Sequence, residues 1–353
     1  MLVFNYCTKV MKSVKKDHVT CFCLFLHIEN VVRLNNKNNQ FSIKIRAIAA
    51  CLLWGSAFAG AKIGFQYAEP IFLSGMRFAL AGLLLYPVIR MQKIDIRANL
   101  KHWRFMLLFA FTQTFLQYGL FFMGLNKVPG ATSAVIIGAG PLFVAIMAHL
   151  TLKNDKLTWR KMIAIGLGIA GVVFISLAKG NLMSDDPSFY TGVLLLVLSN
   201  MIGSYTNIMV VKKKSYHISP VVLTSFANFT GGIMLLITAF IVEQPEIKIY
   251  PAEFYGALLW LAFIPAAGFT LWYGLLQRPE VKVSELNIWK FLIPVTGSVL
   301  SWILLPGEYP DLVTIIGILI ITVALLLLQL PNRFFTNRKK RLPPEEVLNK
   351  SDR

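Results

Sequence analysis

Apolar runs of membrane-spanning length alternate with short polar gaps between residues 45 and 330 of this 353-residue chain. A helix needs roughly 20 apolar residues to cross a hydrocarbon core of about 30 Å. The runs predict transmembrane helices at residues 45–66, 70–90, 104–124, 130–151, 162–178, 189–211, 219–242, 254–276, 284–305 and 311–330. Because the gaps are short, consecutive helices are expected to be antiparallel neighbours. The pattern therefore predicts an all-α membrane protein with ten transmembrane helices.

The two ends of the chain do not follow this pattern. Residues 1–42 are basic and contain one apolar stretch, from Val19 to Ile28, which is too short to span a bilayer. No small-residue cleavage site of a signal peptide follows this stretch. We interpret residues 1–42 as a disordered extension or as sequence upstream of the true start, and residues 331–353 as a basic cytoplasmic tail.

Composition supports a bilayer as the solvent of this chain. Hydrophobic residues make up 56% and charged residues only 15%, whereas about a quarter of the residues in soluble domains are charged. A net charge of +18 would suggest a nucleic-acid partner in a soluble protein. Here the basic residues lie in the gaps between apolar runs, so the lipid bilayer is an expected partner and nucleic acid is not.

The charges of alternate gaps differ in sign and predict the orientation. One set of gaps and the C-terminal tail hold most of the Lys and Arg residues, among them Arg90, Lys93, Arg97, Lys153, Lys212 and Arg338. The other set holds only three lysines and eight acidic residues, among them Glu69, Asp185, Glu243, Glu308 and Asp311. Because basic loops stay on the cytoplasmic side, both termini are expected to be cytoplasmic.

The two halves of the chain show weak similarity at an offset near 150 residues. Glu69-Pro70 and Ser219-Pro220 open the second and seventh predicted helices, and Tyr118-Gly119-Leu120 recurs as Tyr273-Gly274-Leu275. Pro141 corresponds to Pro294. Because each half has an odd number of helices, five, the second half must be inserted upside down. Inverted repeats are typical of secondary transporters, whose substrate site lies between the halves.

Several short motifs carry a more specific signal. They are Leu53-Trp54-Gly55-Ser56-Ala57-Phe58, Pro70 with Arg77-Phe78, Gly124-Leu125 with Pro129-Gly130-Ala131-Thr132-Ser133-Ala134, and Pro294 with Gly307-Glu308. Together they resemble the EamA domain of the drug/metabolite transporter superfamily, present twice, at residues 43–180 and 187–330. The first half departs from that pattern at Asn154-Asp155, and the second half lacks the Trp-Gly motif. The resemblance implies a central cavity and transport of small solutes across a bacterial inner membrane.

Aromatic and cationic residues inside the spans are the first candidates for substrate binding. Trp54 and Phe58 lie one turn apart and are candidates for an aromatic cavity wall, with packing of Trp54 against glycine-rich neighbours as the alternative. Arg77 is positioned to hold a carboxylate in two-pronged geometry, with pairing to Glu69 or contact with the lipid interface as alternatives. Lys290 lies one turn before Pro294, which removes a backbone hydrogen bond. A broken helix with a cation predicts an anion site; a snorkelling lysine beside a kink is the alternative.

Polar stripes on four helices complete the candidate site. Gln113 and Gln117 lie at i and i+4 beside Tyr118, Asn200 and Asn207 share a face with Ser204, Tyr273 lies on the eighth helix, and Asn287 shares a face with Lys290. Polar residues inside a membrane mark substrate pathways or join helices through hydrogen bonds. The spacing alone favours neither interpretation.

The leading hypothesis is a secondary transporter that moves a small metabolite, such as an amino acid, and export is the expected direction. An intramembrane enzyme needs a nucleophile with a base, paired carboxylates or metal ligands at depth, and the spans contain no such set. A receptor or scaffold is expected to have a large loop or a soluble domain, which the short gaps do not provide. We therefore expect no catalytic residue, metal or cofactor, and a small-molecule substrate as partner, with association into a homodimer left open.

Overall fold

The computed structural model describes residues 39–151, 158–182, 187–246, 248–278, 281 and 283–329. The elements in chain order are α3 (Asn39–Gly64), α4 (Pro70–Leu84), α5 (Tyr86–Met91), α6 (Ile96–Leu100), α7 (Trp103–Phe109), η1 (Ala110–Leu116), α8 (Gln117–Lys127), α9 (Gly130–Gly138), α10 (Gly140–Thr151), α11 (Trp159–Leu182), α12 (Pro187–Lys212), η2 (Lys214–Tyr216), α13 (Pro220–Val242), α14 (Ala252–Leu276), α15 (Val283–Asn287), η3 (Ile288–Phe291), α16 (Leu292–Leu304) and α17 (Leu312–Gln329). These ranges contain no β-strand, which confirms the all-α class. The predictions for residues 1–38 and 331–353 lie outside the described residues.

The helices occupy the places of the predicted apolar runs. Within the described ranges, eight helical stretches are long and apolar enough to cross a membrane, and two shorter apolar helices, Trp289–Leu304 and Leu312–Leu328, follow them. The first helix begins at Asn39 rather than at residue 45. It therefore includes the last residues of the segment that the sequence assigned to an N-terminal extension.

Prolines determine where several helices begin and where two are interrupted. Pro70 and Pro220 lie in the first turns of α4 and α13, where the missing N–H costs no helical hydrogen bond. Pro141 lies at the junction of α9 and α10, and Pro294 follows the 3₁₀ turn η3 that separates α15 from α16. The interruption expected before Pro294 is thus present, and Lys290 lies in that turn. The residues Ala110–Leu116 form a π-helix, a distortion that is frequent at functional sites.

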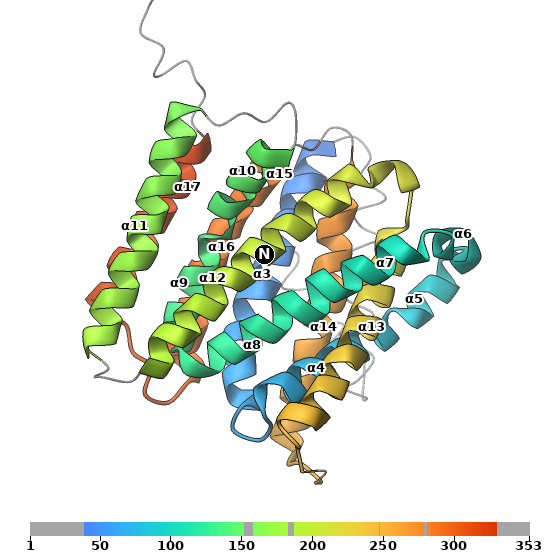
Figure 1. Ribbon diagram of the computed structural model, residues 1–353, viewed down its shortest axis with the longest axis horizontal. Helices are drawn as coiled ribbons and strands as arrows, with labels where there is room; N and C mark the ends of the chain where they lie inside the picture. The colour runs from blue at the N-terminus through green and yellow to red at the C-terminus, as the bar shows by residue number, and fades with distance from the viewer. Residues whose placement is uncertain are drawn as a thin grey trace, which may run out of the picture.

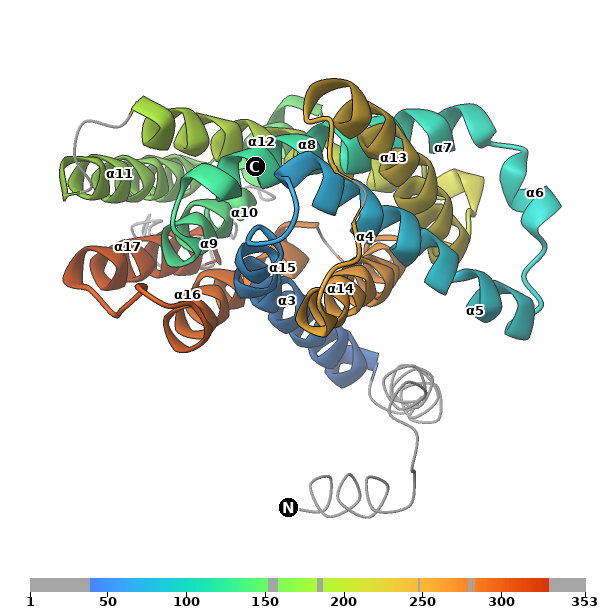
Figure 2. The same ribbon diagram turned by 90° about the horizontal axis from the view of Figure 1, so that it is seen from below.

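The helices form one bundle in which the two halves of the chain interleave. The pair α11 and α17 lies at one edge and the pair α4 and α13 at the other, while α3 and α12 lie between them (Figures 1 and 2). Helix α3 packs against α14 and α16, and α12 packs against α8 and α10. Central helices of each half therefore take most of their neighbours from the other half.

Glycines allow the backbones of α4 and α13 to touch. A Cβ atom at Gly232 would lie 2.3 Å from the backbone nitrogen of Ala79, and one at Gly82 would lie 2.6 Å from that of Phe229. Small residues let helices approach closely in membranes, where van der Waals packing drives association. This contact fixes the position of Arg77, which lies on α4 between Gly75 and Gly82.

Two carboxylates join the halves at one end of the bundle, which we name the acidic end and define by Glu69, Glu243, Glu308 and Asp311. The Glu243 carboxylate accepts the backbone N–H groups of Ile71 and Phe72 at 2.9 and 2.8 Å. The Glu308 carboxylate accepts those of Gly130 and Ala131 at 2.6 and 2.9 Å. Both acids lie at helix N-termini, where unpaired N–H groups and the helix dipole favour a negative charge.

Candidate functional site

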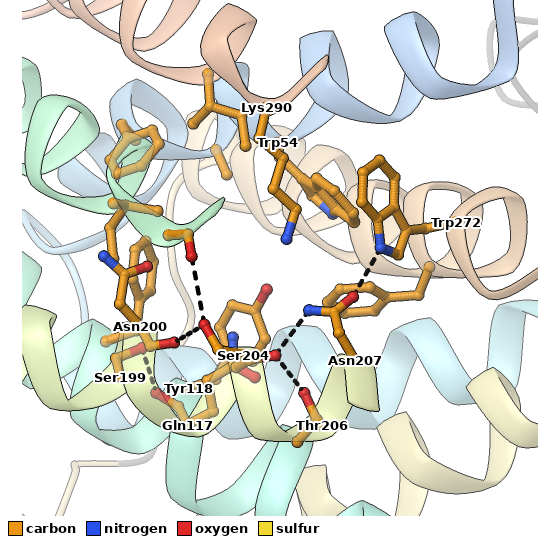
Figure 3. A pocket seen from close by; sticks show the side chains of 18 of the residues that line it. Trp54, Gln117, Tyr118, Ser199, Asn200, Ser204, Thr206, Asn207, Trp272 and Lys290 are labelled. Atoms are coloured by element: carbon orange, nitrogen blue, oxygen red, sulfur yellow. Dashed lines mark hydrogen bonds between the residues drawn. The ribbon is translucent and has the colours of Figure 1, made fainter. Parts of the chain in front are cut away.

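A cavity lies in the middle of the bundle between helices of both halves. The volume of the cavity is about 90 Å³, counted as the space open to the centre of a water-sized sphere. This is room for several water molecules or for part of a small solute. The lining residues are Trp54, Ala57, Phe58, Arg77, Gln117, Tyr118, Phe121, Ile137, Gly140, Ser199, Asn200, Gly203, Ser204, Thr206, Asn207, Phe269, Trp272, Tyr273, Lys290 and Ile293. Figure 3 shows the polar residues of α12 on one side and Trp54, Trp272 and Lys290 on the other.

Arg77 is a buried cation without a hydrogen-bonding partner for two of its nitrogens. Only 2% of the residue is exposed, and its Nε and Nη1 atoms donate to no acceptor. The guanidinium lies over the rings of Phe78, Phe122 and Tyr118, at 4.6, 4.9 and 5.7 Å from their centroids. This burial is incompatible with the alternative that Arg77 reaches the lipid interface. No carboxylate among the described residues forms an ion pair with it.

Lys290 reaches the cavity from the turn η3. Its ammonium nitrogen lies 4.9 Å from the centroid of the Trp272 ring and 5.7 Å from that of Trp54. Both distances are within the range of a cation–π interaction. The two indoles are themselves in edge-to-face contact, with centroids 5.1 Å apart. Lys290 therefore lies against an aromatic pair inside the cavity instead of extending to the membrane surface.

Aromatic rings connect the surroundings of the two cations. The Tyr118 ring contacts Phe269 at a centroid distance of 5.8 Å, and Phe269 contacts Trp54 at 5.5 Å. Phe269 also stacks on Tyr273 at 5.4 Å. The expected aromatic wall is thus larger than Trp54 and Phe58 alone.

The amides of α12 line the cavity but already have partners in the protein. Asn200 Nδ2 donates to the carbonyl of Ile136 at 2.8 Å, next to the break between α9 and α10. Asn207 Nδ2 donates to the carbonyl of Gly203 at 2.7 Å, and its Oδ1 accepts the indole N–H of Trp272 at 2.9 Å. Both interpretations of this stripe apply, because the residues line the cavity and also join α12 to neighbouring helices.

Nine of the eleven residues proposed from the sequence line this cavity: Trp54, Phe58, Arg77, Gln117, Tyr118, Asn200, Asn207, Tyr273 and Lys290. The other two, Gln113 and Asn287, are buried away from it. The Gln113 side chain accepts the hydroxyl of its neighbour Thr114 at 2.7 Å. Asn287 Nδ2 donates to the carbonyl of Val283 at 2.8 Å within its own helix.

Three large aromatic residues of the site, Phe121, Phe269 and Trp272, were not among the residues proposed from the sequence. Trp272 is 1% exposed and lies one residue before Tyr273, which the internal repeat identified. An indole N–H inside a transmembrane run needs an acceptor, and this requirement could have drawn attention to Trp272. Phe269 is one of many Phe residues in the spans, so no comparable signal marks it.

The charged side chains among the described lining residues are both positive. They are Arg77 and Lys290, and this described lining contains no Asp or Glu. Within the described ranges, no three His, Cys, Asp or Glu side chains are grouped so that they could hold a metal ion. The arrangement can therefore bind an anionic group through charge-assisted hydrogen bonds and an apolar body through the rings.

The family comparison agrees with this geometry. The model of the EamA-like transporter family matches residues 42–177 and again residues 190–330. The chain belongs to this family. It is therefore a transporter, embedded in a membrane through several helices, and not an enzyme.

Individual relatives of this EamA-like transporter are distant. The uncharacterized transporter YoaV of Bacillus subtilis is 22% identical over 300 residues, which cover 84% of this chain and 99% of the relative. An S-adenosylmethionine/S-adenosylhomocysteine transporter of Chlamydia trachomatis is 24% identical over 267 residues, 73% of this chain and 80% of that protein. A chain of known crystal structure aligns with a TM-score of 0.63 and 16% identity, over 82% of this chain and 97% of its own length. That structural likeness supports the fold alone.

Proposed function

We propose that this protein is a secondary transporter that exports a small metabolite, an amino acid or a related solute, across a bacterial inner membrane by alternating access. The substrate site is the central cavity, with Arg77 and Lys290 as the anion-binding groups and the aromatic residues as the apolar wall. The burial of Arg77 without a hydrogen-bonding partner carries the proposal. A guanidinium inside a membrane protein is costly unless it is paired, and a bound acidic substrate supplies the missing partner.

The packing of the helices supports two inverted five-helix halves, 43–180 and 187–330. Helices that correspond in the two halves pack on each other, as α4 does on α13, α9 on α16 and α11 on α17. The contacts of α3 with α14 and α16 have counterparts in those of α12 with α8 and α10. This reciprocal pattern is what a pseudo-two-fold axis in the membrane plane produces.

Such an axis gives alternating access a physical basis. Two inverted halves can exchange conformations, so that inward-open and outward-open states have similar energies. In the present arrangement the contacts of Glu243 and Glu308 join the halves at the acidic end. We assign the acidic end to the outside and both termini to the cytoplasm, because the gaps at the other end carry the basic residues. Opening to the outside then requires these two contacts to break.

The proposal is tested by flux and by resistance. Purified protein in proteoliposomes should exchange labelled amino acids, and cells that contain the protein should resist toxic metabolite concentrations better than cells without it. Arg77→Gln and Lys290→Gln should each lower transport by about tenfold or more, since one charge-assisted hydrogen bond contributes about 1.5–3 kcal/mol. Arg104→Gln is the matched control, because Arg104 is exposed beside Trp103. If transport is unchanged in both cavity variants, Arg77 and Lys290 do not bind the substrate and have a structural role instead.

A further inference from the structure

We infer that the cavity is built for a dianionic organic solute, with one acidic group on Arg77, a second on Lys290 and an apolar body between them. This inference rests on the proposed function and narrows its substrate class. It follows from two separate cations without a hydrogen-bond or ion-pair partner among the described residues, from the rings between them, and from the lack of an acidic side chain among the described lining residues.

The first acidic group belongs at Arg77. Its Nε and one Nη atom are buried and donate to nothing, and the three surrounding rings offer only their faces. A carboxylate or phosphate can accept two parallel N–H bonds from one guanidinium. Because the protein itself supplies no such acceptor in the described residues, the site at Arg77 is complete only when a ligand oxyanion is present.

The second acidic group belongs at Lys290. An ammonium group carries three donors, yet Lys290 forms no hydrogen bond or ion pair with the described residues; its neighbours are the indole faces of Trp54 and Trp272 and the Cys51 thiol. In Figure 3 Lys290 lies with these indoles across the cavity from the α12 stripe. A ligand acid here would add hydrogen bonds to the cation–π contacts without displacing either ring.

The two cations are separate sites, one in each half of the chain. Arg77 lies on α4 and Lys290 in η3. Three rings in successive contact, Tyr118, Phe269 and Trp54, run from one cation to the other. A ligand with two acidic groups and an apolar or planar middle would therefore bridge the halves and lie along these rings.

A zwitterion or a cation fits this lining less well. Neither Asp nor Glu is among the described residues that line the cavity, and the side-chain oxygen of Asn207 already accepts the Trp272 indole N–H. A ligand ammonium or sulfonium group would face two fixed positive charges in a medium of low dielectric constant. We therefore expect net-negative solutes to be preferred over neutral amino acids and over S-adenosylmethionine, the substrate named for one relative.

Thermal stabilisation of the purified full-length protein by defined probes tests the inference. The probes are linear α,ω-dicarboxylates of increasing length, the monoamide of each diacid, neutral amino acids and S-adenosylmethionine. We expect one diacid length to bind at least about tenfold more tightly than its own monoamide, as one additional charge-assisted interaction gives. Arg77→Gln and Lys290→Gln should each abolish this difference, Arg77→Lys should retain part of it, and Arg104→Gln should leave it intact.

The outcomes separate this inference from the proposed function. If diacids and monoamides bind equally, or if neutral amino acids or S-adenosylmethionine bind best, the dianion inference is overturned. Flux of neutral amino acids in proteoliposomes would in that case leave the transporter proposal in place. If no probe is transported and resistance in cells is also unchanged, the proposed function itself is wrong.

Discussion

The carboxylate of Glu308 accepts the backbone N–H of Gly130 at 2.6 Å. These two residues belong to different halves of the chain, and each lies in a sequence motif, Gly307-Glu308 and Pro129-Gly130-Ala131. The second oxygen of Glu308 accepts the N–H of Ala131 at 2.9 Å. Glu308 of the second half thus caps the N-terminus of α9 in the first half. The Gly307-Glu308 motif and the Pro129-Gly130-Ala131 motif are therefore in contact with each other.

Glu308→Ala should destabilise the protein. It removes the acceptor of two N–H groups at the start of α9, and a hydrogen bond to a charged group contributes about 1.5–3 kcal/mol. We expect a clear drop in the thermal midpoint of the purified protein, with Glu308→Gln intermediate because its amide oxygen still accepts. Glu246→Ala is the control, since Glu246 is exposed on the same end. Equal midpoints for the two alanine variants would contradict the capping role.

The pH dependence of stability should reveal Glu243. Burial is the largest influence and raises the pKa of Glu243; the N–H groups of Ile71 and Phe72 lower it and Glu69 raises it further. A folded-state pKa above the unfolded value means that this group's contribution is full below the unfolded pKa, about 4.3, and is lost as pH rises through the folded pKa. The stability of the wild type relative to Glu243→Gln should therefore increase as pH falls from about 7 to about 4.3.

The pKa of Asp311 is shifted in the opposite direction to that of Glu243. Burial alone would raise its pKa, but hydrogen bonds from Lys179, at 2.9 Å, and from Thr314 lower it below the ordinary value. A depressed folded pKa contributes stability above the unfolded pKa, about 3.9, which is lost as pH falls through the folded pKa. The destabilisation caused by Asp311→Asn should therefore shrink in acid. Parallel pH profiles for the two variants would show that at least one of the two assignments is wrong.

Arg77→Met should stabilise the protein while abolishing transport. The substitution replaces a buried, incompletely paired cation by a flexible apolar side chain of similar length among Phe78, Phe122 and Tyr118. Relief of an unsatisfied buried donor contributes roughly 1–3 kcal/mol, so the thermal midpoint should rise in the absence of substrate. Such a gain at the expense of activity is characteristic of functional sites. A strongly lowered midpoint would instead show that Arg77 holds the fold together.

Gly232→Ala should weaken the contact of α4 with α13. The new Cβ atom would lie 2.3 Å from the Ala79 backbone nitrogen, so the two helices must separate. We expect a loss of folded protein in detergent, measured by size-exclusion chromatography. Gly256→Ala on α14 is the matched control, because nothing lies within 4 Å of its added atom and alanine favours a helix by about 1 kcal/mol over glycine. A similar loss in both variants would argue against a specific contact.

The sequence predicted more of the fold than of the site. Apolar length located the helices, and proline predicted the interruption at Lys290, because both effects are local. Of the polar residues, Gln113 and Gln117 share one predicted stripe, yet only Gln117 lines the cavity. Gln113 lies inside the π-helix Ala110–Leu116 and Gln117 directly follows it, so the α-helical spacing that predicted a shared face does not apply. No residue pattern predicted that distortion.

The amino-acid sequence by itself determined that the chain is an all-helical membrane protein, where its helices lie, and that cations and amides are embedded in them. These properties depend on hydrophobicity and on helical periodicity within single segments. Only the tertiary structure decided which of the embedded groups meet. In the folded protein Arg77 and Lys290 line one cavity. Asn207 forms a hydrogen bond with Trp272, and Glu308 accepts the backbone N–H of Gly130. Such pairings depend on how each helix is rotated and packed against helices more than 60 residues away in the chain, and no local pattern encodes that rotation.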